Sequence, residues 1–321
     1  MRTNRRTTQK PDFPARTAPR TGSLDELDAV IATCRACPRL VAWREEAARV
    51  KRRAFRDWEY WARPVPGFGP SDAPLTVVGL APAAHGGNRT GRIFTGDPSG
   101  DALYAALYDI GLASQPTATH RGDGLGLCRV RITVPVHCAP PDNRPTTTER
   151  DTCRPWLARE LELLRPTLRA IVVLGAFAWQ ALLPVLAEAG WQTPRPRPAF
   201  GHGAEVMLTH AGDGRPLHLI GGYHPSQRNM STRTLTPAML RDVLRRGAEA
   251  GGLLALDPQV AADGAGGART EPGYGRLGAR ARRGRCPLPR EEDAHCPAFG
   301  VRRSAFGVRG SGFGVRSSVR R

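Results

Sequence analysis

Short, wholly apolar runs alternate with amphipathic segments along the middle of the chain. Four apolar runs predict buried strands, at residues 75–80, 130–136, 170–174 and 217–220. Apolar residues at helical spacing predict helices around and between them, at residues 24–31, 101–111, 147–164, 176–188 and 237–249. Strands of this kind alternating with helices indicate an α/β fold, in which a mostly parallel four-stranded sheet is covered by helices on both faces.

Both ends of the chain differ in composition from this middle part. The formal charge is +18, of which residues 1–22 supply +5 and residues 269–321 supply +9. Towards the C-terminus Phe-Gly-Val-Arg recurs every seven residues in a low-complexity segment. We therefore predict a disordered basic leader over residues 1–22, a folded domain over 23–250 and a disordered tail over 251–321. Such ends could bind a polyanion, but solvated, disordered ends are the simpler interpretation.

The sequence carries no sign of a membrane segment. No apolar run approaches the ~18 residues that a membrane helix requires. The Arg- and Thr-rich N-terminus also lacks the apolar core of a secretory signal. We expect a cytoplasmic protein with no membrane partner, and nothing in the sequence argues against a monomer.

Three of the four predicted strands run directly into loops that hold His, Asn or Asp. The longest loop, Gly79–Asp97, is dense in glycine, which lets the backbone come close to a bound group. His137–Asn143 follows the second strand and Tyr223–Ser226 follows the fourth. Ligands of open parallel sheets bind beyond the carboxyl ends of the strands. We therefore predict one shared ligand site at this edge of the sheet.

Four of the seven cysteines have a spacing that suits metal ligation. Cys34 and Cys37 form a close pair, Cys138 follows a strand, and Cys153 comes shortly afterwards. Four thiolates complete either a tetrahedral zinc site or a [4Fe–4S] cluster, and spacing alone does not choose between the two. Four unrelated buried cysteines are the remaining alternative. The default role of such a site is structural.

The loop of residues 79–97 closely resembles the signature of type-5 (B-type) uracil-DNA glycosylases. Four further blocks resemble that family in the same order: Cys34–Val41, Tyr60–Gly69, Cys138–Thr146 and Tyr223–Ser226. The resemblance spans about residues 23–250. It implies a three-layer α/β/α sandwich and a [4Fe–4S] cluster, in preference to zinc, on Cys34, Cys37, Cys138 and Cys153. It also implies removal of uracil from DNA, with tolerance for other deaminated bases such as hypoxanthine.

The family's chemistry can be placed on particular residues. An enzyme that acts on a base takes it out of the stack and into a pocket. Phe94 would offer the face on which the base stacks, with core packing as its alternative role. His224 would donate a hydrogen bond to uracil O2 as negative charge develops there. Asp97 would orient water and stabilise the cationic sugar, and its place before Pro98 also suits a helix N-cap.

Other loop residues complete the expected site. Asn143 could pair with uracil O4 and N3–H, because a carboxamide is both donor and acceptor. His85 and Asn88 would either hold base edges or phosphates or brace the loop, and the resemblance adds Ala81 to the substrate-binding set. Arginines are natural phosphate contacts, and the candidates are Arg89, Arg92, Arg144 and Arg228.

The sequence departs from the family pattern at two places, and two alternative functions also remain. Ile93 stands where the family has a proline, and residues 227–236 only approximate the family's loop after the histidine. That loop is the candidate for entering the minor groove. A non-catalytic iron–sulfur nucleic-acid-binding module of the same fold is the main alternative to a uracil-DNA glycosylase, and a zinc enzyme is the third.

Overall fold

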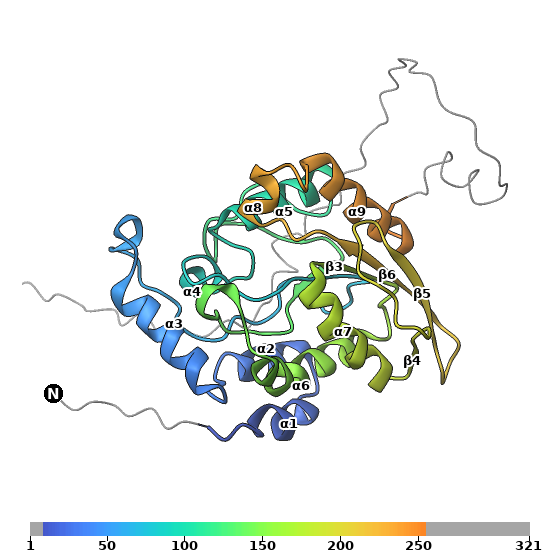
Figure 1. Cartoon of the computed structure of the whole chain (residues 1–321), viewed down its shortest axis with the longest axis horizontal. Helices are drawn as coiled ribbons and strands as arrows, with labels where there is room; N and C mark the ends of the chain where they lie inside the picture. Colours follow the sequence, from blue (N-terminus) through green and yellow to red (C-terminus); the bar gives the residue numbers. More distant parts are fainter. Residues whose placement is uncertain (1–8, 255–321) are drawn as a thin grey trace, which may run out of the picture. The chain divides into compact units, whose positions relative to one another are not determined.

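A six-stranded sheet with the strand order β2-β1-β3-β6-β5-β4 forms the centre of the structure, a computed structural model that describes residues 9–254 (Figure 1). Four strands are parallel: β1 Leu75–Val78, β2 Val130–Thr133, β3 Ala170–Leu174 and β6 Pro216–Gly222. They are the four strands that the sequence predicts, so the mostly parallel α/β fold is confirmed.

Two strands were not predicted. β5 Glu205–His210 pairs antiparallel with β6, and the two-residue β4 Trp191–Gln192 pairs antiparallel with β5. β5 alternates between exposed and more buried positions, and Met207 on it is 63% exposed. Such a half-exposed strand lacks the continuous apolar run by which the four parallel strands were found.

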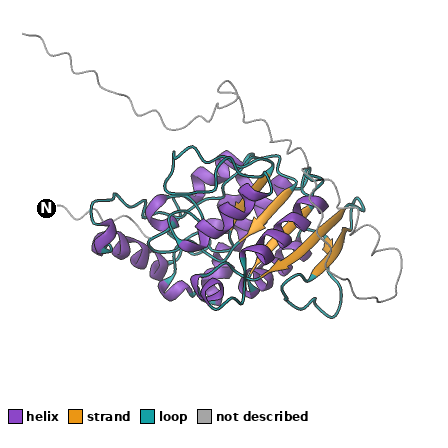
Figure 2. Cartoon of the chain, turned by 90° about the horizontal axis from the view of Figure 1, so that it is seen from above, coloured by secondary structure: helices purple, strands orange, loops and turns teal. Residues whose placement is uncertain are grey.

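Helices cover both faces of the sheet and form the outer layers (Figure 2). β3 shows the division, because Ile171 and Val173 belong to one apolar core and Ala170 and Val172 to the other. The helices packed on the first core are α1 Phe13–Thr17, α2 Leu24–Ile31, α6 Thr147–Leu164 and α7 Ala176–Glu188. Those on the second are α5 Pro98–Asp109 and α9 Pro237–Ala250.

The sequence did not predict α3 Pro38–Val50, which begins directly after Cys37. The short helices α4 Gly87–Thr90 and α8 Gln227–Ser231 lie in the loops after β1 and β6. Three one-turn 3-10 helices complete the described elements: η1 Ala18–Arg20, η2 Arg53–Phe55 and η3 Pro141–Asn143. None of the helices within residues 9–254 is long and apolar enough to cross a membrane.

The ordered structure begins earlier than predicted. The ring of Phe13 packs edge-on against Trp156 of α6, with ring centroids 6.0 Å apart, and Ala18 is buried. The predicted domain start at residue 23 is therefore too late. The rest of the predicted leader, residues 1–8, and the predicted tail from residue 255 onward lie outside the described residues.

Candidate active site and cysteine site

Loops from the carboxyl ends of β1, β3 and β6 meet at one edge of the sheet. The ring of Phe94, in the loop after β1, lies beside the imidazole of His224, which follows β6; their centroids are 5.8 Å apart and their planes differ by 30°. A Cβ on Gly79 would lie 2.5 Å from the Phe94 ring, and one on Gly175 would lie 3.3 Å from Cβ of His224. The structure thus brings together two of the predicted site residues.

The loop that carries Phe94 is held in an unusual backbone conformation. Phe94 itself has a φ of +50°, in the left-handed region that side chains rarely adopt. The Tyr104 hydroxyl of α5 donates a hydrogen bond of 2.9 Å to the carbonyl of Ile93. A Cβ on Gly100 would collide with the carbonyl of Phe94. The start of α5 therefore fixes the backbone on both sides of this ring.

Asp97 is the N-cap of α5, as its sequence position suggested. Its Oδ1 accepts hydrogen bonds from the backbone N–H groups of Ser99 and Gly100, at 3.0 and 3.1 Å. Its Oδ2 lies against Gly86, where any Cβ would collide with it. Burial raises the pKa of the Asp97 carboxyl, although the two N–H donors act in the opposite direction. Oδ1 therefore caps the helix, and Oδ2 faces the glycine-rich loop.

His224 is held through its backbone. The Asn229 side chain donates a hydrogen bond of 2.8 Å to the carbonyl of His224, and Nδ1 of His202 accepts the N–H of the preceding Tyr223 at 3.2 Å. Burial lowers the pKa of the His224 imidazole to about 4. At neutral pH this ring is uncharged and carries one N–H donor.

His85 and Asn88 take different places in the loop after β1. Nδ1 of His85 shares a hydrogen bond of 3.0 Å with the hydroxyl of Tyr60. Asn88 is fully buried, and its Nδ2 donates to the carbonyls of Arg44 and Ala84, at 3.1 and 3.3 Å. Asn88 therefore braces the loop against α3, which was one of the two roles open to it.

Within residues 9–254, Asn143 and Ala81 take no part in the hydrogen bonds and ring contacts of Phe94, Asp97 and His224. Asn143 ends the one-turn helix η3, has a φ of +54°, and is exposed. Its side chain makes no hydrogen bond to another residue within 9–254. Ala81 packs on the small apolar cluster of Leu40, Val136 and Cys138. Ala81 thus connects the loop to the cysteine site.

Two of the arginines expected to contact phosphate have internal partners instead. Arg89 is buried, and it donates to the carbonyls of His85 and Gly96 at 2.7 and 2.9 Å. Arg92 is also buried and forms a two-pronged ion pair with Asp123, at 2.8 and 2.6 Å. The phosphate role is therefore wrong for these two residues. Arg144 and Arg228 are exposed and stay candidates.

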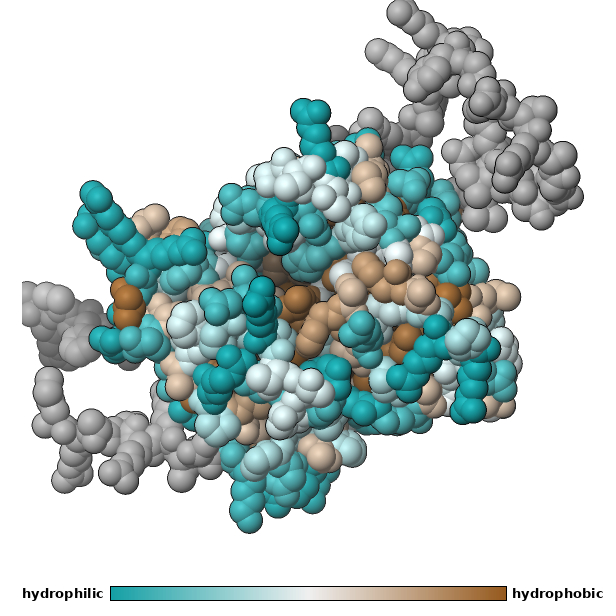
Figure 3. Space-filling view, viewed as in Figure 1, coloured by the Kyte–Doolittle hydropathy of each residue, from teal (hydrophilic) through white to brown (hydrophobic). Residues whose placement is uncertain are grey.

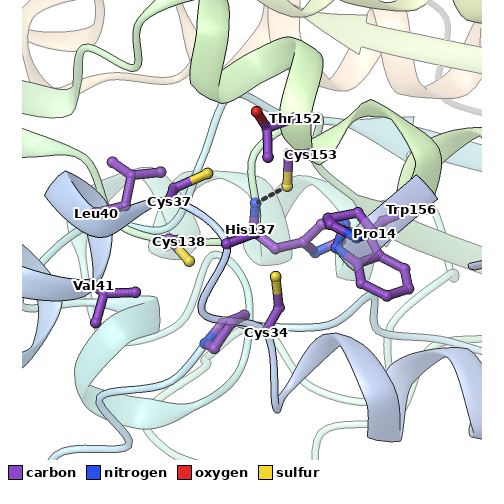
Figure 4. Close-up of a pocket in the computed structure, with 12 residues that line it drawn as sticks. Pro14, Cys34, Cys37, Leu40, Val41, His137, Cys138, Thr152, Cys153 and Trp156 are labelled. Atoms are coloured by element: carbon purple, nitrogen blue, oxygen red, sulfur yellow. Dashed lines mark hydrogen bonds between the residues drawn. The ribbon is translucent and has the colours of Figure 1, made fainter. Parts of the chain in front are cut away.

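The four predicted metal-ligating cysteines line one small cavity. Figure 4 shows their four sulfurs facing a common space between α3, α6 and the segment after β2. They come from three stretches of chain and form no disulfide: Cys34, Cys37, Cys138 and Cys153. No group of three or more His, Cys, Asp and Glu side chains within residues 9–254 has the arrangement to hold a metal ion by itself.

A buried cation borders the cysteine cavity. The guanidinium of Arg44 donates hydrogen bonds to Sγ of Cys138 at 2.9 Å and to the carbonyl of Cys34 at 3.1 Å. The N–H of His137 donates to Sγ of Cys153 at 3.4 Å. Burial raises the pKa of Cys138 to about 11. Because Arg44 also accepts the Asn88 amide at its carbonyl, it links the cysteine site to the loop after β1.

Figure 3 shows an apolar hollow on the face where Figure 1 labels α4, α7 and α8. A parallel sheet with an aromatic ring, a carboxylate and a neutral histidine in the loops at its carboxyl edge is the arrangement of an α/β enzyme. The family model for the uracil DNA glycosylase superfamily matches residues 66–246.

Individual relatives show to which group within this superfamily the chain belongs. A type-5 uracil-DNA glycosylase of Mycobacterium tuberculosis is 56% identical over 232 residues, which cover 72% of this chain and 83% of the relative. Those of Thermus thermophilus and Pyrobaculum aerophilum are 47% and 44% identical; the matches cover 70% and 73% of this chain and 96% of each relative. The chain therefore belongs to the uracil DNA glycosylase superfamily, and within it to the type-5 uracil-DNA glycosylases.

Proposed function

We propose that this protein hydrolyses the N-glycosidic bond that joins uracil to deoxyribose in DNA and leaves an abasic site. Family membership supports the reaction class, and the pairing of Phe94 with His224 beside the glycine-rich loop carries the argument for this chain. Phe94 and His224 follow different parallel strands, and together they place an aromatic face and a neutral donor at the carboxyl edge of the sheet.

Phe94 is proposed to stack on the everted base. A base–aromatic stack contributes about 1–3 kcal/mol and accepts any base, because every base has a π-face. The 5.8 Å between the Phe94 and His224 rings leaves no room for a base between them. The base would therefore lie beside this pair of rings and not between them, with its edge towards the imidazole.

Bond cleavage leaves negative charge on uracil and positive charge on the sugar, as in other oxocarbenium-like reactions. We propose that His224 stabilises the negative charge on uracil. A neutral imidazole fixed by its backbone can donate its N–H to uracil O2 without first losing a proton, in the manner of an oxyanion hole. The lowered pKa of His224 keeps this neutral form in place at physiological pH.

We propose that Asp97 stabilises the positive charge on the sugar. The Oδ2 of this carboxylate is not used by the cap of α5 and faces the loop. There it would orient the attacking water and stabilise the cationic sugar. The two N–H groups that hold Oδ1 fix the direction of the carboxylate before the substrate arrives.

Base recognition is proposed to involve Asn143 and His85. Asn143 is exposed, so its amide is available to uracil O4 and N3–H when the base enters. The resemblance to the type-5 family implies tolerance for other deaminated bases, and stacking on Phe94 is compatible with it, so we extend the proposal to hypoxanthine. Selection among bases then depends on the polar edges that Asn143 and His224 meet.

The cysteine site is proposed to hold a [4Fe–4S] cluster on Cys34, Cys37, Cys138 and Cys153. The donor set fits: four sulfurs face one cavity, and the buried Arg44 offsets negative charge there. Four thiolates can ligate either a zinc ion or a cluster, and the resemblance to the type-5 family favours the cluster. Such a cluster would tie α3 and α6 to the segment after β2.

A uracil-release assay tests the proposal. Purified protein is incubated with an oligonucleotide that carries one uracil, with a matched one that carries hypoxanthine, and with one that carries thymine. We expect abasic sites in the first two and none in the third. Absence of abasic sites on uracil would favour the non-catalytic nucleic-acid-binding module. Brown absorbance near ~400 nm from thiolate-bound iron would separate a cluster from zinc, which is colourless.

A further inference from the structure

A basic segment, Lys51–Trp58, follows α3 and stands apart from the sheet. It carries four cations against one acid, Asp57: Lys51, Arg52, Arg53 and Arg56. All of these charged residues except Lys51 are exposed. Figure 1 draws the turn after α3 at the edge of the molecule, and Figure 3 shows hydrophilic side chains projecting there.

The segment is attached to the loop that carries the site. The guanidinium of Arg89 lies between the rings of Phe55 and Trp58, 3.9 and 4.1 Å from their centroids. Cation–π contacts of this kind hold the guanidinium against the two aromatic rings. Since Arg89 also binds the carbonyls of His85 and Gly96, the segment has a fixed position next to the loop of Phe94 and Asp97.

The outward cations have few partners of their own. Arg52 and Arg53 form no ion pair with a carboxylate within residues 9–254. In the described part of the chain, Nζ of Lys51 donates to the carbonyl of Arg56 and to no other group. The pair of Arg56 with Asp57 is 3.6 Å long, and both side chains are largely exposed, so it contributes little. This contrasts with Arg89 and Arg92, whose charges are used inside the fold.

We propose that the 51–58 segment binds the phosphate backbone of the DNA strand that flanks the target nucleotide. Arg52, Arg53 and Arg56 would contact successive phosphates, and Trp58, which is 36% exposed, would lie against the strand. The partner is DNA because the segment carries net positive charge and adjoins the loop that would receive the base. This inference rests on the proposed function and extends the DNA contact beyond the pocket.

The salt dependence of binding tests this inference. The probe is a 30-nucleotide duplex with an uncleavable 2′-fluoro-deoxyuridine, and its Kd is measured by fluorescence anisotropy over a range of NaCl concentrations. Each phosphate contact contributes about 0.9 to the slope of log K against log salt. For the triple variant R52A/R53A/R56A we expect a slope shallower by about 2 to 3. Its thermal unfolding is compared with wild type to show that the fold is kept.

The control removes three arginines at the opposite edge of the sheet. Arg165, Arg169 and Arg215 lie just before β3 and β6, and Arg215 binds the carbonyl of Pro166 there. We expect R165A/R169A/R215A to keep the wild-type slope. An unchanged slope in R52A/R53A/R56A, or an equal loss in the control, would overturn the inference. Uracil release by the wild type is measured separately, so failure of the proposed function would be visible on its own, and the slopes still decide this inference.

Discussion

The ring of Phe94 lies 5.8 Å from the imidazole of His224, although one follows β1 and the other follows β6. Two features of the sheet produce this contact. β1 and β6 both pair in parallel with β3, so their carboxyl ends reach the same edge. Glycines at the ends of β1 and β3 leave space for the two rings. The contact therefore depends on backbone positions where only glycine fits.

Replacing Phe94 by leucine should lower kcat/KM for uracil release by about 5- to 100-fold, because the stack contributes about 1–3 kcal/mol. Leucine keeps an apolar side chain against Gly79 but has no π-face. Steady-state kinetics on a uracil-containing oligonucleotide give the ratio. As a control, Phe13→Leu removes an aromatic ring from the core on the other face of the sheet, and its kcat/KM should equal that of the wild type. Equal rates for Phe94→Leu and wild type would remove Phe94 from the base pocket.

His224 should remain neutral well below the usual histidine range. Burial lowers its pKa to about 4 in the folded protein, whereas the unfolded chain titrates near pH ~6.5. Between these values the unfolded state takes up the proton first, so this residue lowers the free energy of unfolding as the pH falls from about 6.5 towards 4. NMR titration of the imidazole, with His224→Gln for assignment, gives the folded pKa. An inflection near 6.5 for His224 would contradict the buried, neutral donor.

Asp97 caps a helix and has a proposed catalytic role, and the substitution Asp97→Ser distinguishes these two roles. Serine is as good an N-cap as aspartate, so Asp97→Ser should unfold within a few degrees of the wild type. The carboxylate is lost, so kcat should fall by about 10²- to 10⁴-fold. Calorimetry and single-turnover uracil release measure the two effects. Asp97→Ala should lose both stability and rate, and a fully active serine variant would leave Asp97 as a cap alone.

Arg44 should support the cysteine site through its charge and its two hydrogen bonds. Arg44→Met removes the donors to Cys138 and to the carbonyl of Cys34, and charged hydrogen bonds contribute about 1.5–3 kcal/mol each. We expect a lower free energy of unfolding and less iron per chain. Arg44→Lys keeps the charge without the guanidinium fork and should be intermediate. Iron content and chemical unfolding are the readouts, and a methionine variant with wild-type values in both would argue against this role.

The sequence predicted the parallel sheet because its strands are buried on both faces and read as continuous apolar runs. β5 shows the opposite case, since its exposed positions alternate with more buried ones. α3 was also missed, although Pro38 at its start is a helix signal. Its buried face includes Arg44, a charged residue that no hydrophobic pattern would count.

The site could be predicted in part from the order of strands and loops. Phe94, Asp97 and His224 lie in the loops that follow parallel strands, so a common edge was expected. The roles of Arg89 and Arg92 were not, because sequence does not show whether an arginine meets a carbonyl, an aromatic ring or water. Asp123, the partner of Arg92, is distant in sequence and carries no motif that could have identified the pair.

The central claim is that Phe94, Asp97 and His224 form one pocket that excises an everted uracil. The most direct test is a single-turnover assay of uracil release, from one oligonucleotide and at saturating enzyme, by wild type, Asp97→Ser and His224→Ala. We predict abasic sites with the wild type and rates at least about 10²-fold lower with both variants. Wild-type rates in both variants would contradict the claim.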